Sequence, residues 1–249
     1  MEKITKSYEY FLLFNKEVFY NKLSYVWSLV FPIVFILLNS YNERDTMTYT
    51  EFSSYLFFFW SFMVLITAAD GIGMGILLMR DRNFLKMYTY ISGDKLPIVF
   101  GKVLSQCFFL LVNIVLFTVI SGMLYSQPVG SLLLTAFLIL VVCTIPIYLL
   151  FLITSSLRIK SNGIGPVLTI LVLVLVNFSN VRMDTNSILD LIVYLNPAFV
   201  LTHISEVIHH SLLGTTYEII WLTFLSLALY CIIGFFGYRK LDIITREGR

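Results

Sequence analysis

Asp70 is the residue whose type and position most clearly suggest chemistry, because its carboxylate lies well inside a long apolar stretch. In a membrane such a group costs about 2.5 kcal/mol or more, so it should face protein or water. Asp70 therefore either lines a polar path or is hydrated or paired near the inner third of its span. Asn113 and Asn177 also lie in apolar stretches, where amide side chains form interhelical hydrogen bonds. These three residues are the candidates for a translocation path.

The glycines that follow Asp70 are not expected to form a phosphate-binding loop. They lie inside the same apolar stretch, and Gly71 and Gly75 form a GxxxG pattern that allows close helix packing. No GxxxxGK[ST] sequence occurs in the chain. We therefore expect this chain to bind no nucleotide cofactor itself.

All three histidines lie close together further along the chain. His203, Glu206 and His210 are spaced i, i+3 and i+7, which places them on one helical face, and His209 lies beside them. A metal could use such a set, but no HExxH pattern accompanies it. A helix at the membrane interface with polar side chains toward water explains the same spacing. We assign no metal site and no catalytic residue.

The elements that carry these residues are expected to be membrane-spanning helices. The 249 residues are 58% hydrophobic and 13% charged, and the mean hydropathy is +0.86, whereas a soluble domain carries about 25% charge. Apolar stretches of about 20 residues match the thickness of a bilayer. Cys107, Cys143 and Cys231 fall inside these stretches and are expected to be small core residues. The prediction is one all-α integral membrane domain over residues 1–249, with six transmembrane helices at 23–40, 55–79, 98–125, 132–157, 163–178 and 219–238.

The basic residues predict how these spans are oriented. All of the 17 Lys and Arg residues except Arg44 and Arg182 fall on one side of a six-span arrangement. This predicts that both chain ends of a multi-pass protein lie in the cytoplasm. The frequent Ile, Asn, Lys, Tyr and Phe residues are typical of an AT-rich bacterial genome, so we expect the cell (plasma) membrane of a bacterium. The net charge of only +2 does not favour nucleic acid as a partner.

Two segments outside the spans are expected to lie in or near the membrane interface. Residues 1–22 place apolar and charged residues at helical spacing, which predicts an amphipathic interfacial helix in contact with membrane lipid. Residues 179–217 are rich in apolar residues, but Asp190, Asn196 and Pro197 interrupt them. Short external re-entrant or interfacial helices are therefore expected between spans five and six.

The loop between spans two and three combines charges with apolar residues. An ordinary solvated loop on the positive side would explain the charges. A short helix with exposed apolar residues would instead offer a docking surface to a cytoplasmic partner. We favour the docking element. Its residues are Arg80, Asp81, Arg82, Phe84, Leu85, Lys86, Met87 and Tyr88.

Over its full length the chain resembles a permease, the transmembrane subunit, of the type-2 ABC exporter superfamily. Such permeases have an interfacial amino-terminal helix and a proline in the first span, as at Pro32 here. Asn196-Pro197 is similar to the Asn-Pro segment before their external helices, and Asn83-Phe84 stands where Gly-Thr is usual. The loop residues that match the family pattern are Arg80-Asp81-Arg82, Leu85, Ser92 and Gly101-Lys102.

The resemblance implies a transport subunit that is not itself an enzyme. Two permeases would pair, as a homodimer or with a sister subunit. Each would receive a separate ABC ATPase, which carries ATP and Mg²⁺, on the loop of Arg80 to Tyr88. Motion of the ATPases would rock the spans as rigid bodies and release cargo between the permeases. The 22 Phe and 15 Tyr residues suit an amphipathic or hydrophobic cargo, and we favour export of a peptide, bacteriocin or toxin.

Two other functions stay open from the residues alone. An ion-coupled secondary transporter would use Asp70, although such proteins usually carry more buried acids and an inverted repeat. An intramembrane enzyme would use His209, His210 or Glu206, although their spacing matches no catalytic pattern.

Overall fold

The structure is a computed structural model and describes residues 2–20, 22–43, 47–157, 161–179, 192–212 and 221–242. Every regular element in these ranges is a helix, which confirms the expected all-α class. Two of the elements, η1 and η2, are π-helical segments within longer helices. In chain order the elements are α1 (Glu2–Tyr20), α2 (Lys22–Glu43), α3 (Tyr49–Ile66), η1 (Thr67–Met74), α4 (Gly75–Asp81), α5 (Phe84–Ser92), α6 (Leu96–Tyr125), α7 (Gly130–Ile139), η2 (Leu140–Thr144), α8 (Ile145–Ser156), α9 (Ser161–Phe178), α11 (Pro197–Leu212) and α12 (Trp221–Lys240).

Among the described residues, four continuous helices are long and apolar enough to cross a membrane, which supports a membrane-embedded protein. They match predicted spans two, three, four and six. Shorter apolar stretches, Ser28–Leu38 in α2 and Gly163–Phe178 in α9, match predicted spans one and five. The six-span topology itself stays a prediction. The four long helices are Tyr49–Asp81, Leu96–Tyr125, Gly130–Ser156 and Trp221–Lys240.

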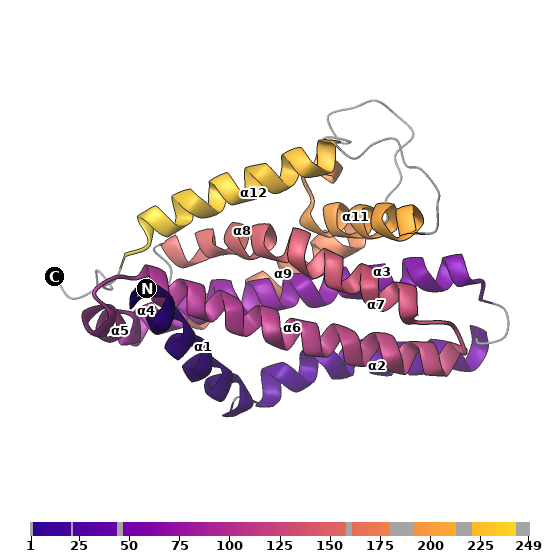
Figure 1. Ribbon diagram of the computed structural model, residues 1–249, viewed down its shortest axis with the longest axis horizontal. Coiled ribbons are helices and arrows are strands. Elements are labelled where there is room, and N and C mark those ends of the chain that lie inside the picture. The colour runs from indigo at the N-terminus through magenta and orange to yellow at the C-terminus, as the bar shows by residue number, and fades with distance from the viewer. Residues whose placement is uncertain are drawn as a thin grey trace.

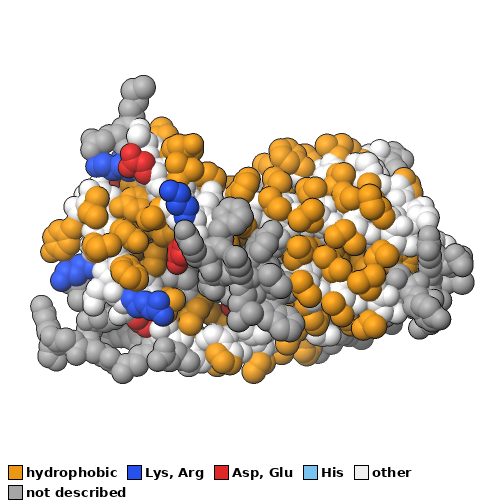
Figure 2. All heavy atoms as spheres, turned by 90° about the horizontal axis from the view of Figure 1, so that it is seen from below, with side chains coloured by type: hydrophobic (Ala, Val, Ile, Leu, Met, Phe, Trp, Pro, Cys, Tyr) orange, Lys and Arg blue, Asp and Glu red, His pale blue; other side chains and the backbone are white. Residues whose placement is uncertain are grey.

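The long helices lie side by side along the long axis of the molecule (Figure 1). α12 packs along α8, α1 packs on α6, and α11 packs on α3 and α7. We call the end where α1, α4 and α5 gather the charged end, because Lys and Arg side chains collect there on the face shown in Figure 2. The other end, where α3 and α7 begin and α11 lies, is the histidine end. Arg44 and Arg182, the two basic residues predicted for the outer side, lie outside the described residues.

The core is built from aromatic side chains and satisfied polar groups. Trp60 is fully buried, and its indole N–H donates to the Thr118 hydroxyl at 3.1 Å. Gly234 and Gly237 let α12 approach α8 closely, since a Cβ on Gly234 would lie 2.5 Å from the carbonyl oxygen of Leu149. Small residues at such crossings allow the tight van der Waals packing that holds membrane helices together.

The amino-terminal helix has the amphipathic character that the sequence predicts. On one side of α1, Tyr10 and Phe14 are buried, and the helix packs on α6. On another side, Ile4, Tyr8 and Leu12 recur every four residues and are exposed. The helix is therefore docked through one face and leaves an apolar stripe uncovered. That this stripe enters a lipid surface stays a prediction.

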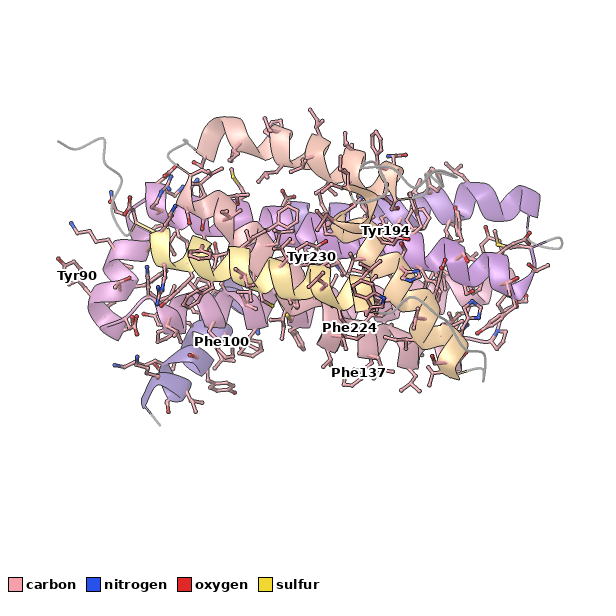
Figure 3. The ribbon with its side chains drawn as sticks, turned by 90° about the horizontal axis from the view of Figure 1, so that it is seen from above. Tyr90, Phe100, Phe137, Tyr194, Phe224 and Tyr230 are labelled. Carbon is pink, nitrogen blue, oxygen red and sulfur yellow. The ribbon has the colours of Figure 1, made fainter. Side chains whose placement is uncertain are left out.

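The segment before α12 reaches into the body of the molecule. The Asn196 side chain donates to the carbonyl oxygen of Leu175 in α9 at 2.7 Å, and the Tyr230 hydroxyl donates to that of Leu195 at 3.0 Å. Tyr230 lies nine residues after Trp221, about 14 Å along α12 at 1.5 Å per residue. α11 starts at this inner turn and runs along α3 and α7 to the histidine end (Figures 1 and 3). Of the predicted stretch 179–217, positions 180–191 and 213–217 lie outside the described residues.

Candidate functional site

The predicted short helix between spans two and three is present as α5, and it is set off by two left-handed residues. Asn83, with φ of 60°, precedes it, and Gly93, with φ of 77°, follows it. Asn and Gly are the residues that adopt this conformation most readily. The chain can therefore turn sharply on both sides of α5 and present the helix at the charged end.

One side of α5 is apolar and uncovered. Phe84, Met87, Tyr90 and Ile91 are 44%, 46%, 80% and 69% exposed, and their spacing places them on neighbouring positions of one helical surface. Tyr90 stands at the very end of the molecule (Figure 3). We call these four residues the α5 apolar face. An exposed apolar cluster within a charged end is typical of a protein-binding surface.

Three of the predicted docking residues point inward instead. Leu85 is fully buried in the core, and Arg80 is 7% exposed. Arg82, Phe84 and Met87 are exposed, whereas Asp81, Lys86 and Tyr88 are half-buried. The structure thus divides the predicted set into an exposed group that can meet a partner and an inner group, formed by Arg80, Asp81 and Leu85, that holds α4 and α5 in place.

Arg80 and Asp81 join two helix ends. The Arg80 guanidinium donates to the carbonyl oxygens of Ser155 and Leu157 at the end of α8, both at 2.8 Å. Asp81 accepts a hydrogen bond at 2.8 Å from the backbone N–H of Ser161, the first residue of α9, and also pairs with Arg80 at 3.3 Å. A cation at a helix carboxyl end and an anion at an amino end both complement the helix dipole. This dyad therefore fixes α8 and α9 to the end of α4.

Lys95 fixes the carboxyl end of α12 in the same way. Its ammonium donates to the carbonyl oxygens of Tyr238 and Leu241, at 2.8 and 3.2 Å, and lies 4.7 Å from the centre of the Tyr238 ring. Because Lys95 is the residue directly before α6, it connects the carboxyl end of α12 to the start of α6.

α1 holds the carboxyl end of α5. Lys6 donates to the carbonyl oxygen of Ser92 at 3.1 Å, and the Tyr10 hydroxyl donates to that of Tyr88 at 3.0 Å. Lys3 pairs with Asp94 at 2.9 Å, and this hydrogen bond lowers the pKa of the Asp94 carboxyl. A movement of α5 must therefore carry α1 with it or break these contacts.

An ion pair between a buried lysine and an exposed glutamate connects α1 to α6. The Lys102 ammonium lies 3.0 Å from Glu17 and 4.8 Å from the centre of the Phe14 ring, and its side chain is 5% exposed. The Ser105 hydroxyl donates to Asn15 at 2.8 Å beside it. Desolvating an ammonium is expensive, so Glu17 is needed to compensate it.

The three translocation candidates are not brought together within this chain. Asn113 is buried and donates to the Ser28 hydroxyl of α2 at 3.0 Å, which confirms the predicted interhelical bond. Asn177 is exposed and donates to Leu173 of its own helix, so the interhelical bond predicted for it is wrong. Its side chain reaches its own backbone first, as amides in helices often do. Asp70 is exposed on η1.

The glycines around Asp70 leave room for side chains of α6 and α8. A Cβ on Gly71 would collide with the Gln106 side chain, and one on Gly75 would lie 3.3 Å from Cε of Lys102. A Cβ on Gly73 would lie 2.5 Å from the Thr154 hydroxyl oxygen. The predicted GxxxG thus packs tightly, although side chains rather than a second backbone fill the space.

The histidines have different surroundings: His203 and His210, which share a face with Glu206, are half-buried, whereas His209 is buried. His209 is 1% exposed and lies against the rings of Tyr49 and Phe57, with centroids 5.6 Å away in both cases. Its Nδ1 is 3.3 Å from the Thr135 hydroxyl oxygen. His209 is buried because α11 lies against α3 and α7. That His203, Glu206 and His210 face water stays a prediction. Within the described residues no group of three His, Cys, Asp or Glu side chains is placed to hold a metal ion.

Sequence reasoning missed the interactions that secure the helix ends. Arg80, Lys95 and Lys102 appear in the sequence as ordinary basic residues of a positive loop. Their partners, which are backbone carbonyls for Arg80 and Lys95 and the Glu17 carboxylate for Lys102, lie 75 to 146 positions away, so no local pattern records them. The π-helical turn around Asp70 was also missed, although three glycines within five residues were a local sign of irregular packing.

Comparison with known proteins identifies no relative of this chain: no protein family matches it, and no curated protein or solved structure does either.

Proposed function

We propose that the chain is the transmembrane permease subunit of an ATP-driven exporter and that a separate ATPase docks on the α5 apolar face. The observation that carries the proposal is this face, because four neighbouring apolar side chains are uncovered at the charged end. A face of this kind, flanked by Arg82 and Lys86, fits a protein partner better than water.

The connections around α5 support a mechanical role for it. α5 is bound to α1 through Lys6 and Tyr10, and the preceding helix is bound to α8 and α9 through Arg80 and Asp81. Motion of a partner seated on α5 would thus reach several spans as a rigid-body displacement. ATP and Mg²⁺ would bind to the partner.

The proposed topology has six spans with the charged end in the cytoplasm of a bacterial cell. The basic residues at this end support the orientation. The turn at Leu195 to Pro197, about 14 Å along α12, supports a re-entrant segment before span six. Such a backbone excursion is tolerated only where protein lines it. A second permease copy or a sister permease would complete the cargo path, and the favoured cargo is an amphipathic peptide, bacteriocin or toxin.

A second candidate function is an ion-coupled secondary transporter. The observation that favours it is Asp70, an exposed acid within a spanning helix. In such a transporter the carboxylate would carry a proton or cation, and no ATPase would be required.

Affinity purification from native membranes in mild detergent tests the docking proposal. The wild-type chain, with a tag at its carboxyl end, should co-purify with an ATPase in about equal amounts. Changing Phe84 and Met87 to Asp should abolish the association, because both side chains are exposed and would face the partner. Leu85 is unsuitable for this purpose, since it is fully buried and its change to Asp would damage the fold.

Met123→Asp supplies the matched control. Met123 is 74% exposed at the opposite end of α6, and its substitution should leave the ATPase bound. A chain that purifies without any ATPase, under conditions that preserve a known exporter complex, would refute the exporter and favour the secondary transporter.

A further inference from the structure

Asp70 is an uncompensated acid on the surface of a membrane-spanning helix. It lies in η1, within the continuous helix Tyr49–Asp81, and its side chain is exposed. Among the described residues no hydrogen-bond donor or cation contacts its carboxylate. A lone carboxylate facing hydrocarbon is unfavourable, so lipid alone is not its natural neighbour.

The basic side chain of the neighbouring α6 segment is already engaged. Lys102 lies beside Gly75, further along the helix that carries Asp70. Its ammonium, however, is paired with Glu17 at 3.0 Å and lies over the Phe14 ring at 4.8 Å. Lys102 is therefore directed to α1, and among the described residues no basic group is left to neutralise Asp70.

The surface that leads to Asp70 is apolar and aromatic. Tyr55, Phe58, Phe62 and Ile66 recur at three- and four-residue intervals along α3, are half-buried, and continue toward Asp70. The helices α2 and α9 pack beside α3, and Phe31 of α2 meets Phe62 with ring centroids 5.3 Å apart. Many exposed side chains of these two helices are also apolar. They include Val30, Phe31, Val34, Phe35, Val167, Ile170, Leu171 and Val174.

A second copy of the chain would not by itself neutralise Asp70. In a two-fold dimer both subunits offer the same surface, so covering this face would add a second Asp70 to the same space. Two carboxylates in a poorly hydrated space repel each other, and a cation between them would be stabilised by both. Aromatic rings also attract organic cations.

We propose that Asp70 binds the positive charge of the cargo, which is therefore a cationic amphipathic molecule with an ammonium or guanidinium group beside apolar surface. The apolar part packs on the aromatic side chains of α3, and the cation reaches Asp70. This inference rests on the proposed transport function, because it assigns the cargo class to that path.

Binding of two matched probes tests the inference without an ATPase. Tetraphenylphosphonium and tetraphenylborate have nearly the same shape and opposite charge. Their binding to the purified chain in nanodiscs of zwitterionic lipid can be measured by equilibrium dialysis, with empty nanodiscs subtracted. The wild type should bind the cation about tenfold more tightly than Asp70→Asn does, which is the loss expected for one unscreened charge contact. Tetraphenylborate should bind the variant as well as, or better than, the wild type.

Two further variants separate charge from fold. Asp70→Glu should retain cation binding, and Glu9→Gln, which removes an exposed acid of α1, should leave both probes unaffected. Equal affinity of wild type and Asp70→Asn for tetraphenylphosphonium would overturn the inference, as would loss of binding in Glu9→Gln. If the ATPase co-purifies and cation binding is independent of Asp70, only this inference fails. If no ATPase co-purifies and Asp70 still selects the cation, the exporter fails and the cation site stands.

Discussion

The two ends of the molecule are held together by different kinds of interaction. At the charged end, ionised side chains bind the open ends of helices: Arg80 on α8, Asp81 on α9 and Lys95 on α12. At the histidine end His209 is instead buried among the uncharged rings of Tyr49 and Phe57. Charge-assisted hydrogen bonds are about twice as strong as neutral ones.

This difference indicates that the charged end can transmit motion between helices and that the histidine end is where helices can separate. Breaking one of the charged hydrogen bonds at the charged end exposes a helix end and leaves a charge without its partner. The helices at the charged end should therefore move together as one rigid body. Separating α11 from α3 and α7 parts the contacts of His209 with Tyr49, Phe57 and Thr135, and elements that move in function are drawn from the less stable regions of a protein. The arrangement fits an ATPase at the charged end and cargo release near the histidine end.

The largest effect is expected from Arg80→Ala. It removes the guanidinium from the carbonyl oxygens of Ser155 and Leu157 and leaves Asp81 without its cation. Loss of one partner from a buried charged network costs about 3–5 kcal/mol. Thermal unfolding in detergent should show a large drop in midpoint. Arg82→Ala, which changes the exposed arginine two positions away, should have almost no effect. Equal stability of the two variants would show that the helix ends at the charged end are not held by this dyad.

A smaller effect is expected at the Lys102–Glu17 pair, and it should be asymmetric. Glu17→Gln leaves the ammonium of Lys102 buried without its carboxylate. We expect the free energy of unfolding to fall by only about 1–2 kcal/mol, because Glu17 itself is half exposed. Lys102→Met removes the buried charge and leaves Glu17 free to reach water, so it should cost less. Chemical denaturation of both variants measures the difference. If Lys102→Met instead lowers the free energy of unfolding more than Glu17→Gln does, the attraction within the pair outweighs the cost of burying the ammonium.

Periodicity and length were sufficient to predict the helices from the sequence. Apolar stretches of bilayer length correspond to the four long helices, and the apolar residues around Phe84 correspond to α5. The roles of Arg80 and Leu85 could not be predicted, because whether a side chain points to a partner or to its own core depends on helices distant in sequence. The burial of His209 could not be predicted for the same reason, since spacing gives the face of a helix but not what covers that face.

The smallest predicted effect concerns pH and the histidine end. Burial, and then the neighbouring His210, lowers the pKa of His209 from its ordinary value of 6.5. Below that value the unfolded chain takes up the proton more readily than the folded chain, so stability should be full above about pH 6.5 and fall as the pH decreases toward the folded pKa. Tyr49 and His210 lie beside His209, with ring centroids 5.6 and 6.3 Å away.

His209→Phe should remove this dependence. The phenyl ring keeps the contacts with Tyr49 and Phe57, and the Thr135 hydroxyl retains its own hydrogen bond to the carbonyl oxygen of Ser131 at 2.9 Å. Thermal unfolding between about pH 7.5 and about pH 5.5 should therefore show a smaller loss in His209→Phe than in the wild type, with His203→Phe behaving as the wild type does. If the wild type and His209→Phe lose stability in parallel, the histidine end is not the acid-sensitive end, and the carboxylates that secure the charged end must account for the loss.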